Sequence, residues 1–320
     1  MFIVLCLLVS IAGYTITPDK SSKTNEQQVE IDRKKPGYKA WFYHSSEQPK
    51  ASLRELFITG KPPHNAIYLY DNLGDTSITN MLVATPLLNK NQGEVISKRY
   101  WFGTDVYGRD VLSRILLGTR ISLSVGLISV LISLVLGVTL GLAAGYFRGW
   151  VDGAVMWLIN VIWSLPTLLL VIAITFALGK GFWQIFVAVG LTMWVELARI
   201  VRGQVFSLRE TEYVQAARML GYSNIRIMFR HILPNCVGPI VVICAANFAS
   251  AILLEAGLSF LGLGVQPPFP SWGQMLSENA DYIYSGAAHL AIIPGLAIML
   301  LVMSFNFVGN GLRDALDVQI

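Results

Sequence analysis

Long apolar runs, separated by short polar stretches, make up most of the sequence beyond residue 100. A helix needs about 20 apolar residues to cross the hydrocarbon core of a bilayer. Five runs are of about that length, at approximately 120–146, 153–178, 182–200, 236–263 and 287–309. A sixth, shorter run opens the chain. The pattern predicts an all-α membrane protein with six transmembrane helices.

The opening run, residues 1–17, is interpreted as the first transmembrane helix, with part of its cytoplasmic lead missing. The alternative is a cleaved secretory signal peptide. We disfavour it because no basic residues precede the apolar run and no convincing pair of small residues marks a cleavage site. Either interpretation places the polar region that follows, residues 18–100, outside the cytoplasm as an insertion between helices 1 and 2.

Basic residues in the short loops set the predicted orientation, because such loops carry an excess of Lys and Arg on the cytoplasmic side. Arg148 lies in the loop between the second and third runs. The loop between the fourth and fifth runs holds several arginines, among them Arg209, Arg218 and Arg226. We therefore expect both loops in the cytoplasm, together with both chain ends.

The composition supports a bilayer environment and argues against several classes of function. The chain is 54% hydrophobic and only 14% charged, unlike soluble domains. Its three cysteines have no paired spacing and its four histidines do not cluster, so neither a metal site nor a membrane enzyme is indicated. The segment from Gly257 to Gly262 imitates the glycine spacing of a phosphate loop, but Leu263 stands where lysine is required. We expect no cofactor, no nucleotide bound to this chain and no nucleic-acid partner.

The charged segment 207–235 lies between two apolar runs and is predicted to form two short helices. Ser207 and Glu210 have the spacing of a capping box at the start of the first helix. Gly221 is expected to end that helix, because glycine adopts the left-handed conformation without steric cost. One face of the first helix is apolar, with residues at i, i+3, i+4 and i+7: Tyr213, Ala216, Ala217 and Leu220.

The second short helix is expected to be capped by Ser223 and to end or kink at Pro234, where the fifth run begins. Its apolar face comprises Ile225, Met228, Phe229 and Ile232. Two interpretations account for the whole segment: docking onto another protein, or lying on anionic lipid headgroups. The residue pattern alone favours neither.

The order of residues in this segment is similar to the cytoplasmic loop by which ABC transporter permeases seat in a groove of their ATPase subunits. The resemblance lies in Ala216-Ala217, Gly221 and Leu233-Pro234. Gln215 departs from it, because the motif often has Glu there, and so does His231, where the motif usually has Ile. The resemblance implies an ATPase-coupling role for Glu212, Ala216, Ala217, Gly221, Arg226, His231, Leu233 and Pro234.

Four further stretches resemble one branch of these permeases, the importers of dipeptides, oligopeptides and nickel. They are FGTDVYGRDVLSRILLGTRISL at 102–123, GYFRGWVD at 145–152, EAGLSFLGLGVQPPFPSWGQML at 255–276 and FNFVGNGLRDALD at 305–317. The resemblance implies the type I ABC importer permease fold for residues 101–320. It does not extend to the polar insertion.

The resemblance further implies a non-catalytic, multi-pass subunit of an ATP-driven importer in the bacterial cytoplasmic (inner) membrane. It would form half of the translocation path for dipeptides or oligopeptides, with nickel or another small solute as the alternative. The implied partners are a second, homologous permease, two ATP-binding cassette subunits and an extracytoplasmic solute-binding protein. A secondary transporter acting alone would instead show an inverted repeat and paired intramembrane charges, and the sequence shows neither.

Polar and small residues interrupt the apolar runs. Asn247, Glu255 and Asn306 either line the path or form hydrogen bonds between helices. We favour the structural role for Glu255, because its surrounding stretch resembles permeases that serve different solutes. Pro166 is expected to kink the third run. Close packing against another helix, in this chain or in the partner permease, is predicted for the repeated small residues Gly137, Gly141 and Gly145.

Overall fold

The computed structural model describes residues 1–19, 27–28, 31–45, 67–68, 93–179, 181–266 and 268–316. Most of the expected insertion therefore lies outside the described residues. The chain divides into two compact units. The first comprises Met1–Thr17, Arg114–Tyr282 and Ala291–Ile320, and the second comprises Pro18–Ser113 and Ile283–Leu290.

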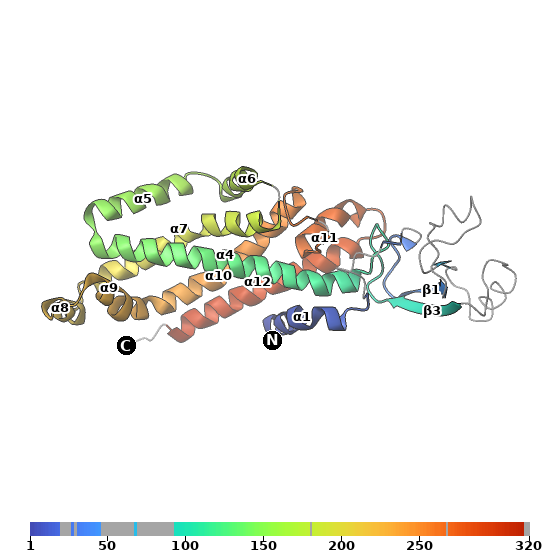
Figure 1. Cartoon of the computed structure of the whole chain (residues 1–320), viewed down its shortest axis with the longest axis horizontal. Coiled ribbons are helices and arrows are strands. Elements are labelled where there is room, and N and C mark those ends of the chain that lie inside the picture. Colours follow the sequence, from blue (N-terminus) through green and yellow to red (C-terminus); the bar gives the residue numbers. More distant parts are fainter. Residues whose placement is uncertain are drawn as a thin grey trace. The chain divides into compact units, whose positions relative to one another are not determined.

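The first unit is helical and contains the apolar runs of the sequence (Figure 1). The helices along the chain are α1 (Phe2–Ile16), α4 (Val111–Phe147), α5 (Gly149–Trp163), α6 (Thr167–Leu178), α7 (Phe182–Leu208), α8 (Glu212–Met219), α9 (Asn224–Ile227), α10 (Leu233–Phe260), α11 (Trp272–Asn279) and α12 (His289–Leu316). A π-helical turn, η3 (Met228–Ile232), joins α9 to α10, and a 3-10 turn, η4 (Ala280–Ile283), follows α11.

Four described helices are long and apolar enough to cross a membrane. They occupy Val111–Phe147, Trp183–Leu208, Asn224–Phe260 and His289–Leu316. A fifth span results if α5 and α6, which are bent by 96° at a break, are counted as one. The opening helix α1 is apolar but shorter than these spans. The described residues thus supply four or five spans by length, against the six expected from the sequence.

The bend between α5 and α6 lies at Pro166, as expected. Proline lacks a backbone N–H and clashes with the preceding turn, so it kinks or breaks an α-helix; α10 and α12 continue past Pro239 and Pro294, whereas the third run breaks at Pro166. The N–H of Leu165 donates to the carbonyl oxygen of Ile162 at 3.3 Å. Pro166 comes next in the chain, and α6 begins at Thr167. The third apolar run is therefore two half-helices rather than one straight span.

The repeated glycines of α4 pack against α7 of the same chain. A Cβ at Gly141 would lie 2.6 Å from the carbonyl oxygen of Ala198, and one at Gly145 would lie 2.8 Å from that of Arg202. A Cβ at Gly137 would meet a side chain of α7 at 2.8 Å. Real Cβ atoms do not approach this closely, so only glycine allows the two backbones to lie together at this spacing. The sequence left open whether these glycines pack against this chain or the partner permease; they pack against α7 of this chain.

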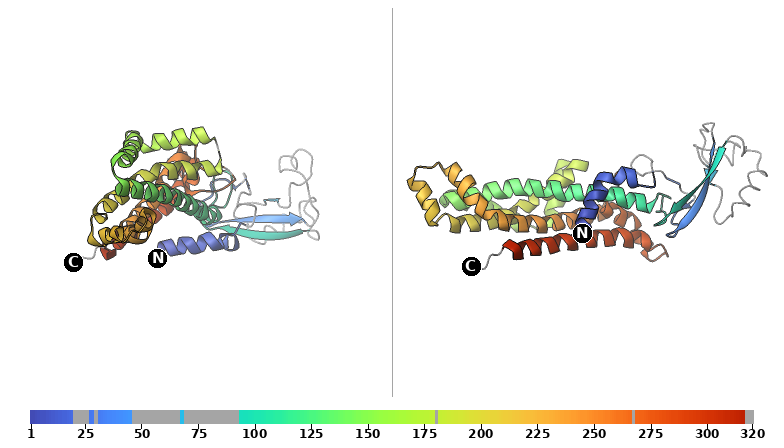
Figure 2. Two further views of the ribbon diagram at one scale, coloured as in Figure 1. Left: turned by 60° about the vertical axis from the view of Figure 1, so that its left-hand side comes forward. Right: turned by 90° about the horizontal axis from the view of Figure 1, so that it is seen from below.

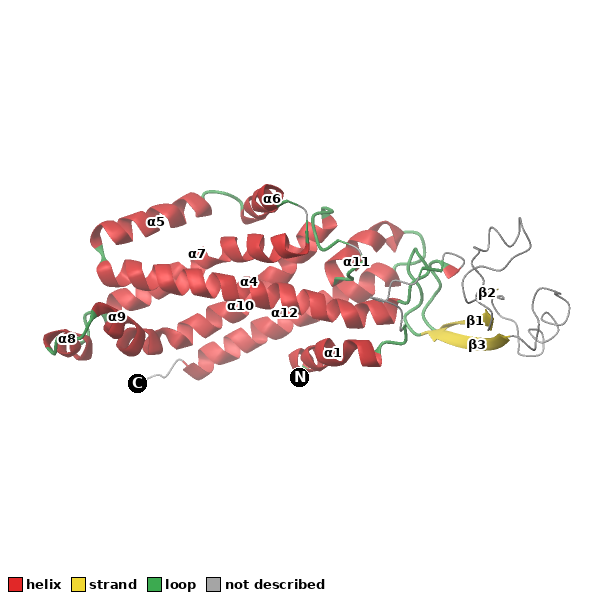
Figure 3. Cartoon of the chain, viewed as in Figure 1, coloured by secondary structure: helices red, strands yellow, loops and turns green. Residues whose placement is uncertain are grey.

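The second unit contains a three-stranded antiparallel sheet, which the all-α expectation missed (Figure 3). Strand β1 (Tyr38–Ser45) pairs along its whole length with β3 (Gly93–Tyr100). The short strand β2 (Ile67–Tyr68) pairs with the other edge of β1. Aromatic residues are frequent in β1, YKAWFYHS, and such residues favour extended structure. The fold is therefore mostly helical, with a small sheet confined to the polar region.

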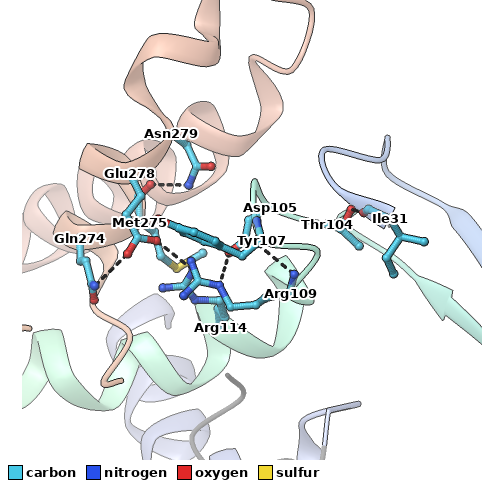
Figure 4. A network of polar contacts seen from close by, with 10 residues as sticks. All are labelled: Ile31, Thr104, Asp105, Tyr107, Arg109, Arg114, Gln274, Met275, Glu278 and Asn279. Carbon is cyan, nitrogen blue, oxygen red and sulfur yellow. Dashed lines mark hydrogen bonds and ion pairs between the residues drawn. The ribbon is translucent and has the colours of Figure 1, made fainter. Parts of the chain in front are cut away.

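A buried ion pair holds the turn that precedes α4 (Figure 4). Asp105 and Arg109 are 0 and 3% exposed, and Arg109 Nε lies 2.7 Å from Asp105 Oδ2. The other carboxylate oxygen accepts hydrogen bonds from the backbone N–H groups of Tyr107 and Arg109, both at 2.9 Å. One carboxylate thus balances a buried cation and closes the turn, which meets the requirement that a buried charge be paired and hydrogen-bonded.

Candidate functional site

The segment expected to couple the chain to other proteins forms the turn between α7 and α10, at one end of the long helices (Figure 2). It consists of α8, α9 and the π-helical turn, which leads into α10 at Leu233. Pro234 lies in the first turn of α10, where a residue without an N–H is tolerated. The expected end or kink at Pro234 is therefore a change of helix type, and the second short helix runs on into the span.

Gly221 ends α8, as expected from the sequence. Its φ of 76° lies in the left-handed region, which is costly for residues with a Cβ. The N–H of Gly221 donates to the carbonyl oxygen of Arg218 at 2.9 Å, and the N–H of Tyr222 donates to that of Ala217 at 3.2 Å. These two bonds form a Schellman motif, which closes a helix C-terminus. Ser223 then caps α9 through its side chain, also as expected.

The expected capping box at the start of α8 is wrong. Ser207 lies in the last turn of α7, which continues to Leu208, and Thr211 occupies the N-cap position of α8. Glu210 instead forms an ion pair with Arg148, whose Nη2 lies 2.7 Å from its Oε1. The spacing fits a capping box, but the preceding helix keeps Ser207 out of the extended conformation that an N-cap requires.

The apolar residues of α8 are divided between the chain's own core and its surface. Val214 and Ala217 are 0 and 4% exposed and belong to a buried cluster with residues of α4, α7 and α10. Tyr213 and Leu220 are 42 and 71% exposed, and Ala216 is also exposed. The expected single apolar face is therefore wrong in one respect, because Ala217 anchors the helix to this chain.

The same division continues in α9 and the π-helical turn. Ile227, Met228 and Ile232 are buried, whereas Ile225 and Phe229 are 68 and 50% exposed. One set of side chains thus fastens the loop to the long helices while another stays uncovered. We call the uncovered set the exposed loop residues; they are Tyr213, Ala216, Met219, Leu220, Ile225 and Phe229.

Tyr146, at the end of α4, ties both short helices to the long ones. Its hydroxyl donates to Asn224 Oδ1 at 2.8 Å. The guanidinium carbons of Arg218 and Arg209 lie 5.1 and 5.7 Å from the centre of its ring, within the range of cation–π attraction. Burial, and then repulsion from Arg218 and Arg148, lowers the pKa of Arg209 below its usual value. The loop therefore carries concentrated positive charge against an aromatic ring.

Two further residues of the expected coupling set contact Tyr222. The His231 ring stacks on it with centres 5.7 Å apart and planes at 17°, and the Arg226 guanidinium lies 4.4 Å from its centre. His231, which departs from the usual isoleucine, thus keeps a packing role inside the loop. Glu212 is exposed in the first turn of α8, where a negative charge interacts favourably with the helix dipole.

Glu255 is held inside the protein by two hydrogen bonds. It is 1% exposed, and its Oε1 accepts from the hydroxyl groups of Ser259 and Ser271, both at 2.8 Å. Ser271 also caps α11 by accepting from the N–H of Gln274 at 3.1 Å. The carboxyl group thus fastens the loop before α11 onto α10, an arrangement that supports the structural interpretation.

Asn247 and Asn306 lie in different surroundings. Asn247 is 3% exposed and its Nδ2 lies 3.5 Å from the carbonyl oxygen of Met193 on α7, whereas Asn306 is exposed on α12. Asn247 also borders a cavity of about 190 Å³ that Glu196 lines from α7. The sequence reasoning missed Glu196, although a single carboxyl group inside the apolar run 182–200 was a visible signal.

Comparison with known proteins identifies the family. Residues 137–320 match the sequence model described as binding-protein-dependent transport system inner membrane component. The chain belongs to this family. The dipeptide transport system permease protein DppC of Alkalihalophilus pseudofirmus is 45% identical over 232 residues, which cover 72% of this chain and 75% of that protein. The glutathione transport system permease protein GsiD of Pectobacterium atrosepticum is 46% identical over 225 residues, with coverages of 70 and 74%.

A solved structure shares the permease fold. A chain of the MetNI methionine ABC transporter, in inward-facing conformations, aligns with a TM-score of 0.52 and 20% identity, and the alignment covers 64% of this chain and 96% of that chain. At this identity the likeness shows the fold alone. The family expected from the sequence motifs is confirmed: the chain is a non-catalytic permease of an ABC importer in the inner membrane, within a system that includes an ATPase and a binding protein.

Proposed function

We propose that this permease imports dipeptides or closely related short peptides and receives the ATPase motion through the loop 212–234. Two relatives carry names for dipeptide and glutathione transport, and both solutes are short peptides with a free amino group. Nickel or another small solute is the second candidate, from the resemblance of the motifs. Six spans of the type I importer fold, with α1 as the first and the polar region 18–100 as an extracytoplasmic insertion, complete the proposal.

The division of the loop into buried and exposed residues carries the coupling proposal. Val214 and Ala217 are buried in the chain's own core, so α8 moves together with the long helices. The exposed loop residues present apolar side chains on helices held at fixed geometry by the Gly221 turn. Apolar residues that a chain leaves exposed on an anchored helix are typical of the helix-in-groove mode of recognition. An ATPase groove is the partner that this arrangement fits.

The complete transporter would contain this chain, a second related permease, two ATPase subunits and a solute-binding protein on the opposite side of the membrane. Each permease would place one such loop on one ATPase. When the nucleotide-bound ATPases close, the loop would carry their displacement through Tyr146 and the buried cluster into α4, α7 and α10. The path between the two permeases would then open alternately to either side.

Arginine substitutions at neighbouring alanines test this proposal. Ala216→Arg places a long charged side chain on the exposed side of α8, so we expect a folded permease that no longer co-purifies with its ATPases. Ala315→Arg, the same change at another exposed alanine near the end of α12, is the matched control and should keep the ATPases. Ala217→Arg instead enters the buried cluster and should lower the yield of folded protein.

Co-expression, co-purification and binding-protein-stimulated ATP hydrolysis are the measurements. If Ala216→Arg retains its ATPases and full coupled hydrolysis, the loop lies on lipid headgroups and the coupling proposal fails. Uptake of a labelled dipeptide, of glutathione and of nickel by the wild-type transporter decides the solute. Uptake of nickel without either peptide would replace the peptide proposal by its alternative.

A further inference from the structure

A polar cavity lies beside the break in the third apolar run. It is lined from α7 by Thr192 and Glu196, from α10 by Asn247 and Ser250, and from the two half-helices by Trp163 and Thr167, among others. All these residues belong to the first compact unit. Four hydroxyl or amide side chains and one carboxyl group thus converge in a part of the sequence that is otherwise strongly apolar.

The cavity lies beside the middle of α7 and the break in the third apolar run. At about 1.5 Å per residue, Glu196 is roughly 20 Å along the axis from either end of α7. The break at Pro166 falls near the centre of the bent pair Gly149–Trp163 and Thr167–Leu178. The carboxyl group of α7 and the residues on either side of the break, Trp163 and Thr167, therefore border one cavity.

The broken backbone cannot face lipid. Ser164, Leu165 and Pro166 are all exposed in this chain, and the break leaves carbonyl groups at the end of α5 and N–H groups at the start of α6 without intrahelical partners. Non-helical backbone at membrane depth is tolerated only where protein covers it or where it borders a water-filled cavity. The side of the cavity that carries the break therefore faces the translocation path or the second permease.

Among the described residues Glu196 forms no ion pair, although Arg199 lies one turn further along α7, with its guanidinium carbon 4.6 Å from the centre of the Trp163 ring. The Glu196 side chain is exposed toward the cavity, and no hydrogen bond or ion pair involves it among the described residues. A carboxylate within a membrane-spanning helix is costly unless a cation or water meets it.

We propose that the cavity is a transient binding site in the path and that the Glu196 carboxylate binds the protonated amino group of the passing peptide. This inference rests on the proposed import of peptides. A free α-amino group has a pKa near ~8 and is mostly protonated at neutral pH. Asn247 and Thr192 supply acceptors beside the carboxylate, so an ammonium group finds several oxygens at once.

The size of the cavity limits what it holds. Its volume of about 190 Å³ corresponds to on the order of six water molecules at about 30 Å³ each. This space accommodates the amino end of a peptide with its first side chain, and the remainder extends into the path. The permease would therefore select solutes by their free amino group, rather than by the length of the peptide or by its second side chain.

The test uses the complete transporter, purified with its partner subunits and reconstituted in proteoliposomes with its binding protein. Uptake of alanyl-alanine and of its N-acetylated form, which lacks the cationic amino group, is measured per ATP hydrolysed. The same binding protein is used with every variant, so its preference between the two solutes is constant. A change in the uptake ratio between variants therefore reports on the permease. Glu196→Gln keeps the shape and removes the charge, and Glu196→Asp keeps the charge. Asp314→Asn, an exposed carboxyl group on α12, is the matched control.

We expect Glu196→Gln to lower alanyl-alanine uptake per ATP by about tenfold or more, the usual loss for a hydrogen bond to a charged group. Uptake of the acetylated peptide should hardly change, so the preference between the two solutes collapses. Glu196→Asp should recover most of the preference for alanyl-alanine over its acetylated form, and Asp314→Asn should match wild type in both uptakes.

Three results overturn the inference, each in a recognisable way. An unchanged solute ratio in Glu196→Gln means that the carboxylate does not meet the amino group. Loss of assembly with the second permease in Glu196→Gln but not in Glu196→Asp means that a cation of that partner neutralises Glu196. If the wild-type transporter itself moves no dipeptide, the proposed function fails and the inference with it, whereas an unaffected variant of an active importer refutes the inference alone.

Discussion

Gly141→Ala should destabilise the permease, because α4 and α7 lie too close together at this position for a methyl group. A Cβ there would lie 2.6 Å from the carbonyl oxygen of Ala198 and 2.8 Å from the Cβ of Val201. Both neighbours are stiff, one being backbone and the other a β-branched side chain. The two helices must therefore separate by several tenths of an ångström. Overpacking of this kind costs about 1–3 kcal/mol.

Gly203→Ala is the matched control. Gly203 also lies inside α7, but nothing is found within 4 Å of its Cβ position. Alanine is favoured over glycine in a helix by about 1 kcal/mol, and this gain applies at both sites. We therefore expect Gly203→Ala to stabilise the protein by up to about 1 kcal/mol. The difference between the two variants, about 1–3 kcal/mol, measures the packing of α4 on α7.

The free energy of unfolding is measured by titrating the detergent-solubilised permease with a denaturing detergent and monitoring tryptophan fluorescence. Wild type and the two variants are compared under identical conditions. If Gly141→Ala is as stable as Gly203→Ala, then α4 and α7 do not lie at the distance described, and the small residues of α4 must face another chain.

Three further perturbations have defined outcomes. Burial raises the pKa of the Asp110 carboxyl group above its ordinary value, so over a range of pH the folded chain keeps a proton that the unfolded chain has lost. The stability of the fold should therefore fall as pH rises from the unfolded pKa of about 3.9 through the raised folded pKa. Asp110→Asn should remove this pH dependence, which is measured by thermal unfolding at a series of pH values. Asp152→Asn breaks the ion pair with Arg202, whose Nη2 lies 2.6 Å from Oδ2; because the pair is only partly buried, the loss should be about 1–3 kcal/mol, and the added change Arg202→Gln should restore part of it in a double-mutant cycle. Glu255→Leu leaves two buried hydroxyl groups without their acceptor and should cost about 1–3 kcal/mol each, while a Glu255→Gln variant that is equally unstable would contradict the assigned hydrogen bonds.

The coupling loop illustrates how far local pattern reaches. Gly221 and Ser223 behave as their residue types predict, since a helix stop and a helix cap depend on a few neighbouring backbone groups. The spacing of Ser207 and Glu210 wrongly predicted a capping box, because Ser207 belongs to the last turn of α7. The predicted apolar face of α8 included Ala217 but not Val214, which is fully buried, because periodicity alone cannot tell which apolar residues meet the chain's own core. Packing against α4, α7 and α10 turned Ala217 inward and left Ala216 outside.

The sequence by itself determined the membrane environment, the helical class, the break at Pro166 and the family. These depend on composition, on runs long enough to cross a bilayer and on ordered motifs, all of which are local along the chain. Only the tertiary structure decided that the glycines of α4 meet α7, that Glu255 is enclosed by two serines and that Glu196 shares a cavity with Asn247. Apart from the hydrogen bond between Glu255 and Ser259, which lie one turn apart on α10, these contacts join different segments of the chain. Such pairs are chosen by how whole helices pack, for which a single sequence carries no local signal.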